Sequence, residues 1–254
     1  MNNPLTNFIK TKPRLFDIAK RALRTLPHKK DANYQFFDDF SKSHNGYVSF
    51  VQVGASDGLR WDPIREFIVR DKWEGIFIEP LPSVFEVLKN NYRYLEKKSK
   101  LVFVNAAISS DAGNLMFWTV EEAFLNKLSV EDRIIYSQKS SFDKEHVLRW
   151  IKSKGHQNSI LKEIRIPCLT LSEVARNHWN GRSINLLVID AEGHEASIIQ
   201  SIDFNVINPD SIFFESHNLG SKKSDVYALL SQHSYELKEI GGDTIASHRN
   251  GPGN

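Results

Sequence analysis

Two short apolar runs, one ending in a glycine-bounded turn and the other in an acid, constrain the fold of this chain most strongly. Residues 48–53 are mostly apolar and stop at Gly54-Ala55-Ser56-Asp57-Gly58, and residues 75–78 form a second run before Glu79-Pro80. A strand, a tight loop, a helix, a strand and then an acid about 20 residues after the loop are typical of a nucleoside pocket. We therefore predict that the Glu79 carboxylate accepts both ribose hydroxyls. The alternative is an acid favoured by the dipole of the next helix.

The glycine spacing of the loop distinguishes between cofactors. A dinucleotide fingerprint, G-x-G-x-x-G, needs glycines where Ser56 and Leu59 stand, because those glycines let the backbone approach a pyrophosphate. A nucleoside cofactor without phosphates fits better, and S-adenosylmethionine is the obvious one. Gly54 and Gly58 can let its methionine portion lie close, although a plain turn between strand and helix explains them equally well. The spacing counts against the main rival enzyme, a nicotinamide-dependent oxidoreductase.

Composition narrows the class of partner and compartment. The 254-residue chain has 33 Lys and Arg against 31 Asp and Glu, a net charge of +2, which is too balanced for a main partner that is nucleic acid. Its lone cysteine, Cys168, excludes an intrachain disulfide framework and predicts a reducing compartment, the cytoplasm. No apolar run approaches the ~20 residues of a membrane span.

We expect an N-terminal helical extension at residues 1–40 and one α/β domain at 41–254. Residues 1–27 interleave basic and apolar side chains, without the unbroken apolar core of a signal peptide. We interpret them as a helix that packs on its own domain, with weak contact to an anionic membrane surface as the alternative. Residues 121–165 are polar and lack clear periodicity, which predicts a helical insertion or lid over the cofactor site.

Strands and helices alternate along the rest of the chain. This order predicts a mostly parallel sheet covered by helices on both faces. We expect strands at 48–53, 75–79, 101–108, 114–119, 184–189 and 211–215, and a terminal antiparallel pair at 235–240 and 244–247. We expect helices at 63–70, 83–94, 172–178, 195–202 and 224–233. Ser83 and Glu86 are predicted to form a capping box on the second of these helices.

Ligands of open α/β sheets bind outside the carboxyl ends of the strands, so the residues that end the strands are the candidate site. Asn105 and Ala106 are expected beside the adenine, on topology alone. Asp190 follows the apolar run 184–189 and can meet the cofactor's amino group, a substrate hydroxyl or a metal ion. Glu192 is expected in the acceptor pocket, although it can equally start the next helix, where acids are favourable. Glu195 is expected to start that helix for the same reason. His194 can be a base or a first-turn residue of the helix.

Glu215 and His217 follow the run 211–214. Alternation places both on one side if the strand continues, and such a pair can deprotonate a hydroxyl at neutral pH. We predict His217 as the general base, oriented by Glu215, with Asp190 and Glu192 lining the acceptor pocket. A solvated strand end is the alternative. The same four side chains could instead bind Mg²⁺ or Mn²⁺ through oxygen ligands and an imidazole.

Aromatic side chains in and beside the polar segment 121–165 are candidates for acceptor recognition, because aromatic faces suit stacking on sugar rings or flat acceptors. A small core of the insertion itself is an equally good explanation. These side chains are Trp118, Tyr136, Phe142, His146 and Trp150.

Together these motifs resemble the FkbM-type family of S-adenosylmethionine-dependent methyltransferases. The resemblance rests on VQVGASDG (51–58), WEGIFIEPLP (73–82), NAAI (105–108), IDAEGHE (189–195) and FESH (214–217). It implies a class I methyltransferase fold, which is Rossmann-like and doubly wound, with a mostly parallel sheet and a reversed C-terminal strand. It also implies O-methylation, often of a sugar hydroxyl in glycans or natural products.

The same resemblance implies which residues hold the cofactor. These are Gln52, Gly54, Ala55, Ser56, Asp57, Gly58, Glu79 and Pro80, with Asn105, Ala106 and Asp190 added from the strand ends. Gln52 stands where many methyltransferases have an acid that helps to hold the amino acid end of the cofactor. We therefore assign the cofactor's ammonium group to Asp190.

The sequence thus predicts an S-adenosylmethionine-dependent O-methyltransferase that acts on a small-molecule or glycan acceptor. A non-catalytic nucleoside-binding protein on the same fold and a nicotinamide-dependent oxidoreductase are the alternatives. Methylation of nucleic acid or protein would predict a basic face or a base-stacking motif such as Asn-Pro-Pro-Tyr, and neither is evident.

Overall fold

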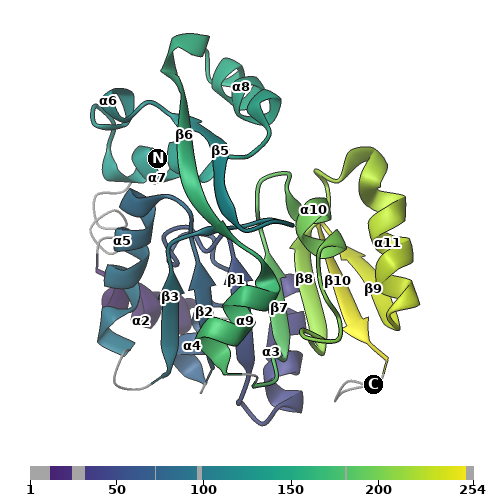
Figure 1. The fold of residues 1–254 in the computed structure, drawn as a ribbon. Coiled ribbons are helices and arrows are strands. Elements are labelled where there is room, and N and C mark those ends of the chain that lie inside the picture. The colour runs from purple at the N-terminus through teal and green to yellow at the C-terminus, as the bar shows by residue number, and fades with distance from the viewer. Residues whose placement is uncertain (1–11, 25–31, 72, 96–98, 181, 250–254) are drawn as a thin grey trace.

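A seven-stranded sheet forms the centre of the molecule, in the order β3-β2-β1-β7-β8-β10-β9 (Figure 1). The structure is a computed structural model, and it describes residues 12–24, 32–71, 73–95, 99–180 and 182–249. Five strands run parallel, and β10 is antiparallel to both of its neighbours. This confirms the predicted α/β class and the reversed C-terminal strand. The strands are β1 (Ser49–Val53), β2 (Glu74–Ile78), β3 (Leu101–Val104), β7 (Leu186–Ile189), β8 (Ser211–Glu215), β9 (Tyr235–Ile240) and β10 (Asp243–His248).

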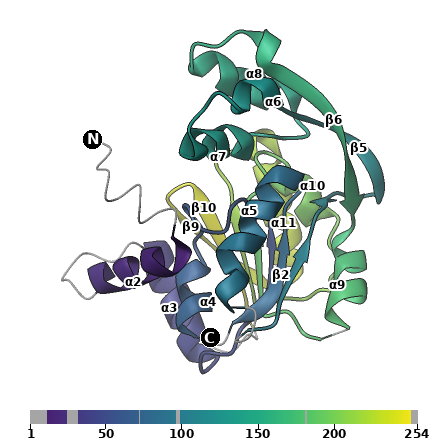
Figure 2. The same cartoon turned by 90° about the vertical axis from the view of Figure 1, so that its left-hand side faces the viewer.

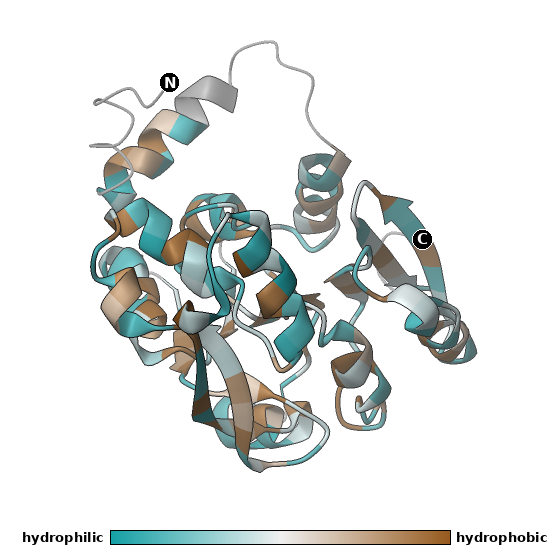
Figure 3. Cartoon of the chain, turned by 90° about the horizontal axis from the view of Figure 1, so that it is seen from above, coloured by the Kyte–Doolittle hydropathy of each residue, from teal (hydrophilic) through white to brown (hydrophobic). Residues whose placement is uncertain are grey.

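Helices cover both faces of this sheet, which explains why its central strands are apolar on both sides (Figure 2). Val51 and Leu187 face one core with α9 (Leu171–Trp179), α10 (Glu195–Gln200) and α11 (Lys223–Gln232). Phe50 and Val188 face the other core. That second face is covered by α3 (Ala32–Ser43), α4 (Arg65–Arg70) and α5 (Pro82–Tyr92). The helices are amphipathic, with hydrophilic and hydrophobic residues side by side along each ribbon (Figure 3).

A second sheet, in the order β4-β6-β5, extends from the carboxyl edge of the main sheet and carries the segment around 121–160 (Figure 1). The predicted single strand at 101–108 is wrong, because β3 ends at Val104 and β4 (Ala107–Ile108) pairs with β6 instead. β5 (Gly113–Val120) pairs along its whole length with β6 (Leu161–Leu169). Between them lie α6 (Glu122–Leu125), α7 (Val130–Gln138) and α8 (Lys144–Ser153). The segment predicted as a helical insertion therefore ends in a strand. The charged residues of β6 obscure the apolar alternation by which a strand is recognised in a sequence.

The predicted capping box is also wrong. Helix α5 begins at Pro82, directly after Leu81, and no side chain caps it. Proline is favoured in the first turn of a helix, so the helix starts one residue earlier than expected and Ser83 lies inside it. A capping box does occur at α9, where Thr170 and Glu173 bond reciprocally.

The described part of the N-terminal segment, α2 (Pro13–Arg24), lies beside α4 (Figure 2). Asp17 forms an ion pair with the buried guanidinium of Arg65, while Leu15 and Ile18 are exposed. The rest of the helix expected at 1–27 lies outside the described residues. The expected boundary at residue 40 falls inside α3, whose Phe37 is buried in the core. No helix within the described ranges is long and apolar enough to cross a bilayer.

Candidate functional site

A cavity of about 390 Å³ opens at the carboxyl ends of β1, β2, β7 and β8, beneath α7 and the segment that follows it. The strand ends contribute most of its polar surface, as expected for an open α/β sheet. Of the residues predicted from the sequence, the structure brings Gly54, Ser56, Glu79, Pro80, Ala106, Asp190, Glu192 and Glu215 together around it.

Strained backbone is concentrated around this cavity. Among the described residues, six that are not glycine have a positive φ. Three of the six, Ser56 (φ 48°), Trp61 (φ 55°) and Glu192 (φ 49°), line the cavity. Such conformations are costly and tend to occur where function requires a particular geometry.

The glycines of the first loop serve close packing inside the protein. A Cβ atom on Gly54 would overlap the backbone carbonyl oxygen of Asp190, so the loops after β1 and β7 touch at the base of the cavity. A Cβ on Gly58 would overlap the side chains of Leu88 and Tyr92. The structure brings Gly58 to α5, away from the lining of the cavity.

Asp57, the acid of this loop, is fully buried and folds the loop back on itself. Its Oδ1 accepts hydrogen bonds from the backbone N–H groups of Leu59 (3.0 Å) and Arg60 (2.9 Å), and its other oxygen pairs with the Arg60 guanidinium. Asp57 therefore holds the loop in shape and does not line the cavity.

Glu79 faces the cavity and is almost completely buried, with 5% of its surface exposed. Its Oε2 accepts the N–H of Ser56 at 3.0 Å, and its Oε1 accepts the N–H of Leu81 at 2.9 Å. Burial raises the pKa of Glu79 to about 7, the two N–H groups oppose this shift, and Asp57 adds to it. A carboxylate has about four lone-pair sites, so about two remain free to accept hydroxyls of a ligand.

An apolar wall continues the cavity on the side of β2 and β4. It consists of Leu81, Val84, Ala106, Ala107, Ile108 and Phe117. Asn105, which we expected beside the adenine, turns its amide NH₂ to the carbonyls of Glu79 (2.8 Å) and Pro80 (3.1 Å). It shapes the turn after β2, while Ala106 and Pro80 line the cavity.

A second cavity of about 160 Å³ adjoins the first and shares Gly54, Ser56, Trp61, Gln138, Asp190 and Glu215 with it. Gln52 lines this second cavity with 4% of its surface exposed, and Ala55 lines it too. Five buried side-chain atoms of the described residues have no hydrogen-bond partner, and three belong here: Asn33 Oδ1, Gln52 Oε1 and Arg60 Nε. Buried polar atoms are nearly always paired, so this cavity is suited to a polar ligand.

Three acids converge where β7 and β8 end. One oxygen from each of Asp190, Glu195 and Glu215 lies within 4.8 Å of the others. Glu195 is buried and accepts N–H groups of Ala191 and Gly193, so it shapes the turn before α10. The Asp190 side chain is exposed to the cavity, but protein atoms surround the rest of it. The resulting loss of solvation, together with the charges of Glu192 and Glu215, raises the pKa of Asp190 well above its ordinary value.

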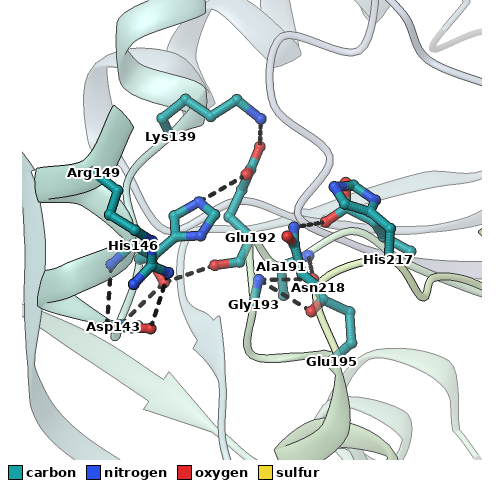
Figure 4. A network of polar contacts seen from close by, with 12 residues as sticks. Lys139, Asp143, His146, Arg149, Ala191, Glu192, Gly193, Glu195, His217 and Asn218 are labelled. Carbon is teal, nitrogen blue, oxygen red and sulfur yellow. Dashed lines mark hydrogen bonds and ion pairs between the residues drawn. The ribbon is translucent and has the colours of Figure 1, made fainter. Parts of the chain in front are cut away.

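Glu192 connects the main sheet to the segment after α7 (Figure 4). Its carboxylate pairs with Lys139 and lies 3.2 Å from Nε2 of His146, and its backbone carbonyl accepts the Ser141 hydroxyl at 2.8 Å. Burial alone would raise the pKa of Glu192, but His146 and Lys139 outweigh burial and the pKa is lowered. Sequence reasoning missed Lys139, because no local signal marks a residue whose partner is 53 positions away.

His217 lines neither of the two cavities. Figure 4 shows its ring next to Asn218. Strand β8 ends at Glu215, and the N–H of His217 donates to the carbonyl of Gly242. Its side chain is 57% exposed, and its Nδ1 lies 3.5 Å from Glu215 Oε1. Glu215 itself lines both cavities and accepts the Asn218 amide at 2.7 Å. Burial and the charge of Glu192 raise its pKa.

Most aromatic side chains named for acceptor recognition are occupied elsewhere. Trp118, Tyr136 and Trp150 pack in a small core of the insertion. Phe142 lines the larger cavity, and His146 bonds to Glu192. The aromatic residue at the junction of the two cavities is Trp61, which sequence reasoning missed although it stands three residues after the loop.

Comparison with known proteins identifies one family. A family model described as the methyltransferase FkbM domain matches residues 52–237. No significant match occurs among curated proteins.

Comparison with solved structures finds several methyltransferases. A methyltransferase FkbM from Methylobacillus flagellatus KT is 11% identical with a TM-score of 0.48, covering 80% of this chain and 44% of that one. A putative caffeoyl-CoA O-methyltransferase from Staphylococcus aureus is 10% identical with a TM-score of 0.47, covering 96% of each chain. Aeropyrum pernix fibrillarin with bound S-adenosyl-L-methionine is 8% identical with a TM-score of 0.42, covering 78% and 66%. The matched part of this chain thus covers less than half of the Methylobacillus protein.

Proposed function

This chain belongs to the FkbM family of methyltransferases, and from that premise we propose that it transfers a methyl group from S-adenosylmethionine to a hydroxyl of a sugar or small glycosylated molecule. The observation that carries the proposal is Glu79, a buried carboxylate that faces a cavity of about 390 Å³ with free lone pairs. A vicinal diol such as that of ribose matches this arrangement, because each carboxylate oxygen can accept one hydroxyl.

The larger cavity fits the adenosine part of the cofactor. Glu79 would hold the ribose, and the apolar wall of Ala106, Ile108 and Phe117 would hold the adenine. Pockets for such ligands combine apolar walls with a few placed polar groups, which is the composition found here.

The smaller cavity fits the amino acid end of the cofactor. Gln52 Oε1 and the Asp190 carboxylate would accept the ammonium group, and Arg60 Nε would donate to the carboxylate. An amide oxygen accepts hydrogen bonds from an ammonium group, so Gln52 can replace the acid that many methyltransferases have at this position.

The cofactor supplies a reactive sulfonium methyl group when bound, and the protein must align the acceptor oxygen and remove its proton. Alignment of bound reactants can contribute ~7–11 kcal/mol. We assign the proton to Glu215, which lines both cavities and whose raised pKa makes it a stronger base. His217, 3.5 Å behind Glu215 and largely exposed, would pass the proton to solvent. The sequence had suggested the opposite assignment, with His217 as the general base and Glu215 as the group that orients it.

The experiment that tests this function is methyl transfer from labelled S-adenosylmethionine to a panel of glycosides, with calorimetric titration of S-adenosylhomocysteine and of NAD. We expect binding of S-adenosylhomocysteine and methylation of at least one glycoside. Binding of NAD alone would favour an oxidoreductase, and binding of S-adenosylhomocysteine without turnover would favour a non-catalytic protein. Glu215→Gln should lower kcat by ~10²–10⁴-fold, and His217→Ala should lower it much less.

A divalent cation is the alternative means of activating the acceptor, since Asp190, Glu195 and Glu215 lie close together. Glu195 is already committed to backbone N–H groups, which leaves two carboxylates for a cation. We therefore assign no step to Mg²⁺ or Mn²⁺ and expect activity to persist in EDTA. Loss of activity in EDTA that Mg²⁺ restores would assign the step to the metal.

The class of acceptor and the cellular location of the protein complete the proposal. We retain a small molecule or glycan in place of nucleic acid because the net charge is only +2. We retain the cytoplasm because the single cysteine, Cys168, is free and buried. Contact of the N-terminal helix with a membrane surface stays a prediction.

A further inference from the structure

Trp61 presents an uncovered indole to the candidate site. Its side chain lines both cavities, yet 68% of its surface is exposed. The other tryptophans are used in packing, since Trp73 and Trp179 are buried and Trp118 and Trp150 pack in the small core of the insertion. Among the described residues, no aromatic ring stacks on Trp61 and no cation lies over its face. This indole is therefore available to a ligand at a position that both cavities share.

The backbone holds Trp61 in this position at a cost in strain. Its φ of 55° is in the left-handed region, which bulky side chains rarely adopt. Both of its neighbours are anchored inside the protein, because Arg60 pairs with Asp57 and buried Asp62 accepts the hydroxyl of Tyr92 at 2.9 Å. Strain that is fixed by its surroundings tends to occur where function requires a particular geometry.

The junction of the two cavities is where the proposed function places the sulfur of the cofactor. The larger cavity was assigned to adenosine and the smaller cavity to the amino acid end. In S-adenosylmethionine the positively charged sulfonium sulfur is the atom that joins these two parts. Its position therefore follows from the connectivity of the cofactor, next to the residues that line both cavities. These residues are Gly54, Ser56, Trp61, Gln138, Asp190 and Glu215.

The charge of this junction favours a cation. Asp190 and Glu215 bring carboxylates to it, whereas neither cationic side chain of the cavities is shared by both. Arg60 lines only the smaller cavity and Lys139 only the larger one, and each is held by an acid in an ion pair.

The indole is the group of this junction that is left for the sulfonium. Asp190 was assigned to the ammonium group of the cofactor, and Glu215 to the proton of the acceptor. A sulfonium has no N–H or O–H to donate, so hydrogen bonds do not recognise it. The face of an aromatic ring attracts a cation without any donor, and tryptophan does so most strongly.

We propose that Trp61 binds the sulfonium of S-adenosylmethionine through a cation–π contact, and that it thereby makes the site distinguish the cofactor from its demethylated product. This inference rests on the proposed function and adds a specificity-determining residue to it. In the transfer, the acceptor oxygen bonds to the methyl carbon, the C–S bond breaks with its electron pair staying on sulfur, and the acceptor proton goes to Glu215. The thioether that results is neutral, so its attraction to the indole is lost and release of the product is favoured.

The experiment measures the Kd of three ligands by calorimetric titration without an acceptor. Two of them are cationic at the junction, namely S-adenosylmethionine and sinefungin, a stable analogue with a protonated amine in place of the methylated sulfur. The third, S-adenosylhomocysteine, is neutral there. Trp61→Leu keeps an apolar side chain but has no π face, so we expect it to raise the Kd of both cationic ligands at least fivefold and that of S-adenosylhomocysteine less than twofold. Trp61→Phe keeps a weaker π face and should fall between Trp61→Leu and wild type.

Met116→Ala is the control, because Met116 is an exposed side chain of β5 outside both cavities. Thermal melting shows whether each variant is folded. An equal rise in the Kd of all three ligands, or an unchanged Kd of the cationic ligands, would overturn the proposal. Wild-type protein that binds none of the three would refute the proposed function and this inference together. The expected selectivity without methylation of any glycoside would refute only the proposed transfer and support the role of Trp61.

Discussion

The Glu79→Gln substitution exchanges one carboxylate oxygen for an NH₂ group and leaves the shape of the side chain almost unchanged. In the protein, the two oxygens accept the N–H groups of Ser56 and Leu81. A glutamine oxygen can keep one of these bonds, but its NH₂ group must face the other donor. The substitution therefore removes one of the two acceptors available to a ribose and the charge that strengthens the other.

The expected loss follows from these bonds. A hydrogen bond to a charged group contributes about 1.5–3 kcal/mol. Losing one such bond and weakening the second should cost about 2–3 kcal/mol of binding free energy, which raises the Kd of S-adenosylhomocysteine by about 30- to 140-fold.

The pH dependence gives an independent check. Burial raises the pKa of Glu79 to about 7, and only the ionised form accepts both hydroxyls. Its ionised fraction rises about tenfold between pH 6 and pH 8, so wild-type affinity should strengthen by up to about tenfold over that range. Glu79→Gln has no such group and should show a flatter profile.

Isothermal titration of S-adenosylhomocysteine from pH 6 to pH 8 measures both effects. Glu86→Gln is the matched control, because Glu86 is an exposed acid on α5 whose one ion pair within the described residues is with Lys89. A Kd for Glu79→Gln within threefold of wild type, in a folded protein, would refute the assignment of the ribose to Glu79. Identical pH profiles for the two proteins would refute the role of its titration.

Three further predictions concern the fold around the site. Gly54→Ala should abolish cofactor binding and lower Tm by far more than Gly241→Ala, because the new Cβ overlaps backbone in the first case and meets open space in the second; equal shifts in thermal melts would contradict this. Glu192→Ala should speed hydrogen exchange in α7 and α8 at least tenfold, because Lys139 and His146 lose their shared partner, and unchanged exchange would show that other contacts hold the insertion. The folded pKa of Glu79 lies above its unfolded value near 4.5, so its contribution should reduce stability as pH rises from 4.5 to 7, by up to about 3 kcal/mol. Denaturant titrations of wild type and Glu79→Gln should diverge over that window.

The main sheet was predictable because its signals are local. Runs such as Leu186–Ile189 are apolar on both faces, and helices on both sides of a parallel sheet require that pattern. The position of Glu79 follows from the same logic, because the end of a buried strand places the next residue at the carboxyl edge. Strand β6 escaped prediction because its partner β5 lies some 50 residues earlier and its exposed side carries charged residues.

The candidate site likewise has a part that local sequence predicts and a part that depends on long-range contacts. The sequence by itself determined that Gly54, Glu79, Asp190 and Glu215 lie at the ends of strands, because alternation and strand length are short-range properties of the chain. The tertiary structure made these strands neighbours. Only the tertiary structure decided that Asp57 and Asn105 turn inward to the backbone, that His217 lies behind Glu215, and that Trp61 stands at the junction of two cavities. The physical reason is that the direction of a side chain depends on which partners reach it. The partners of this site come from segments as distant as Asn33 and Asp243, which chain folding alone brings together.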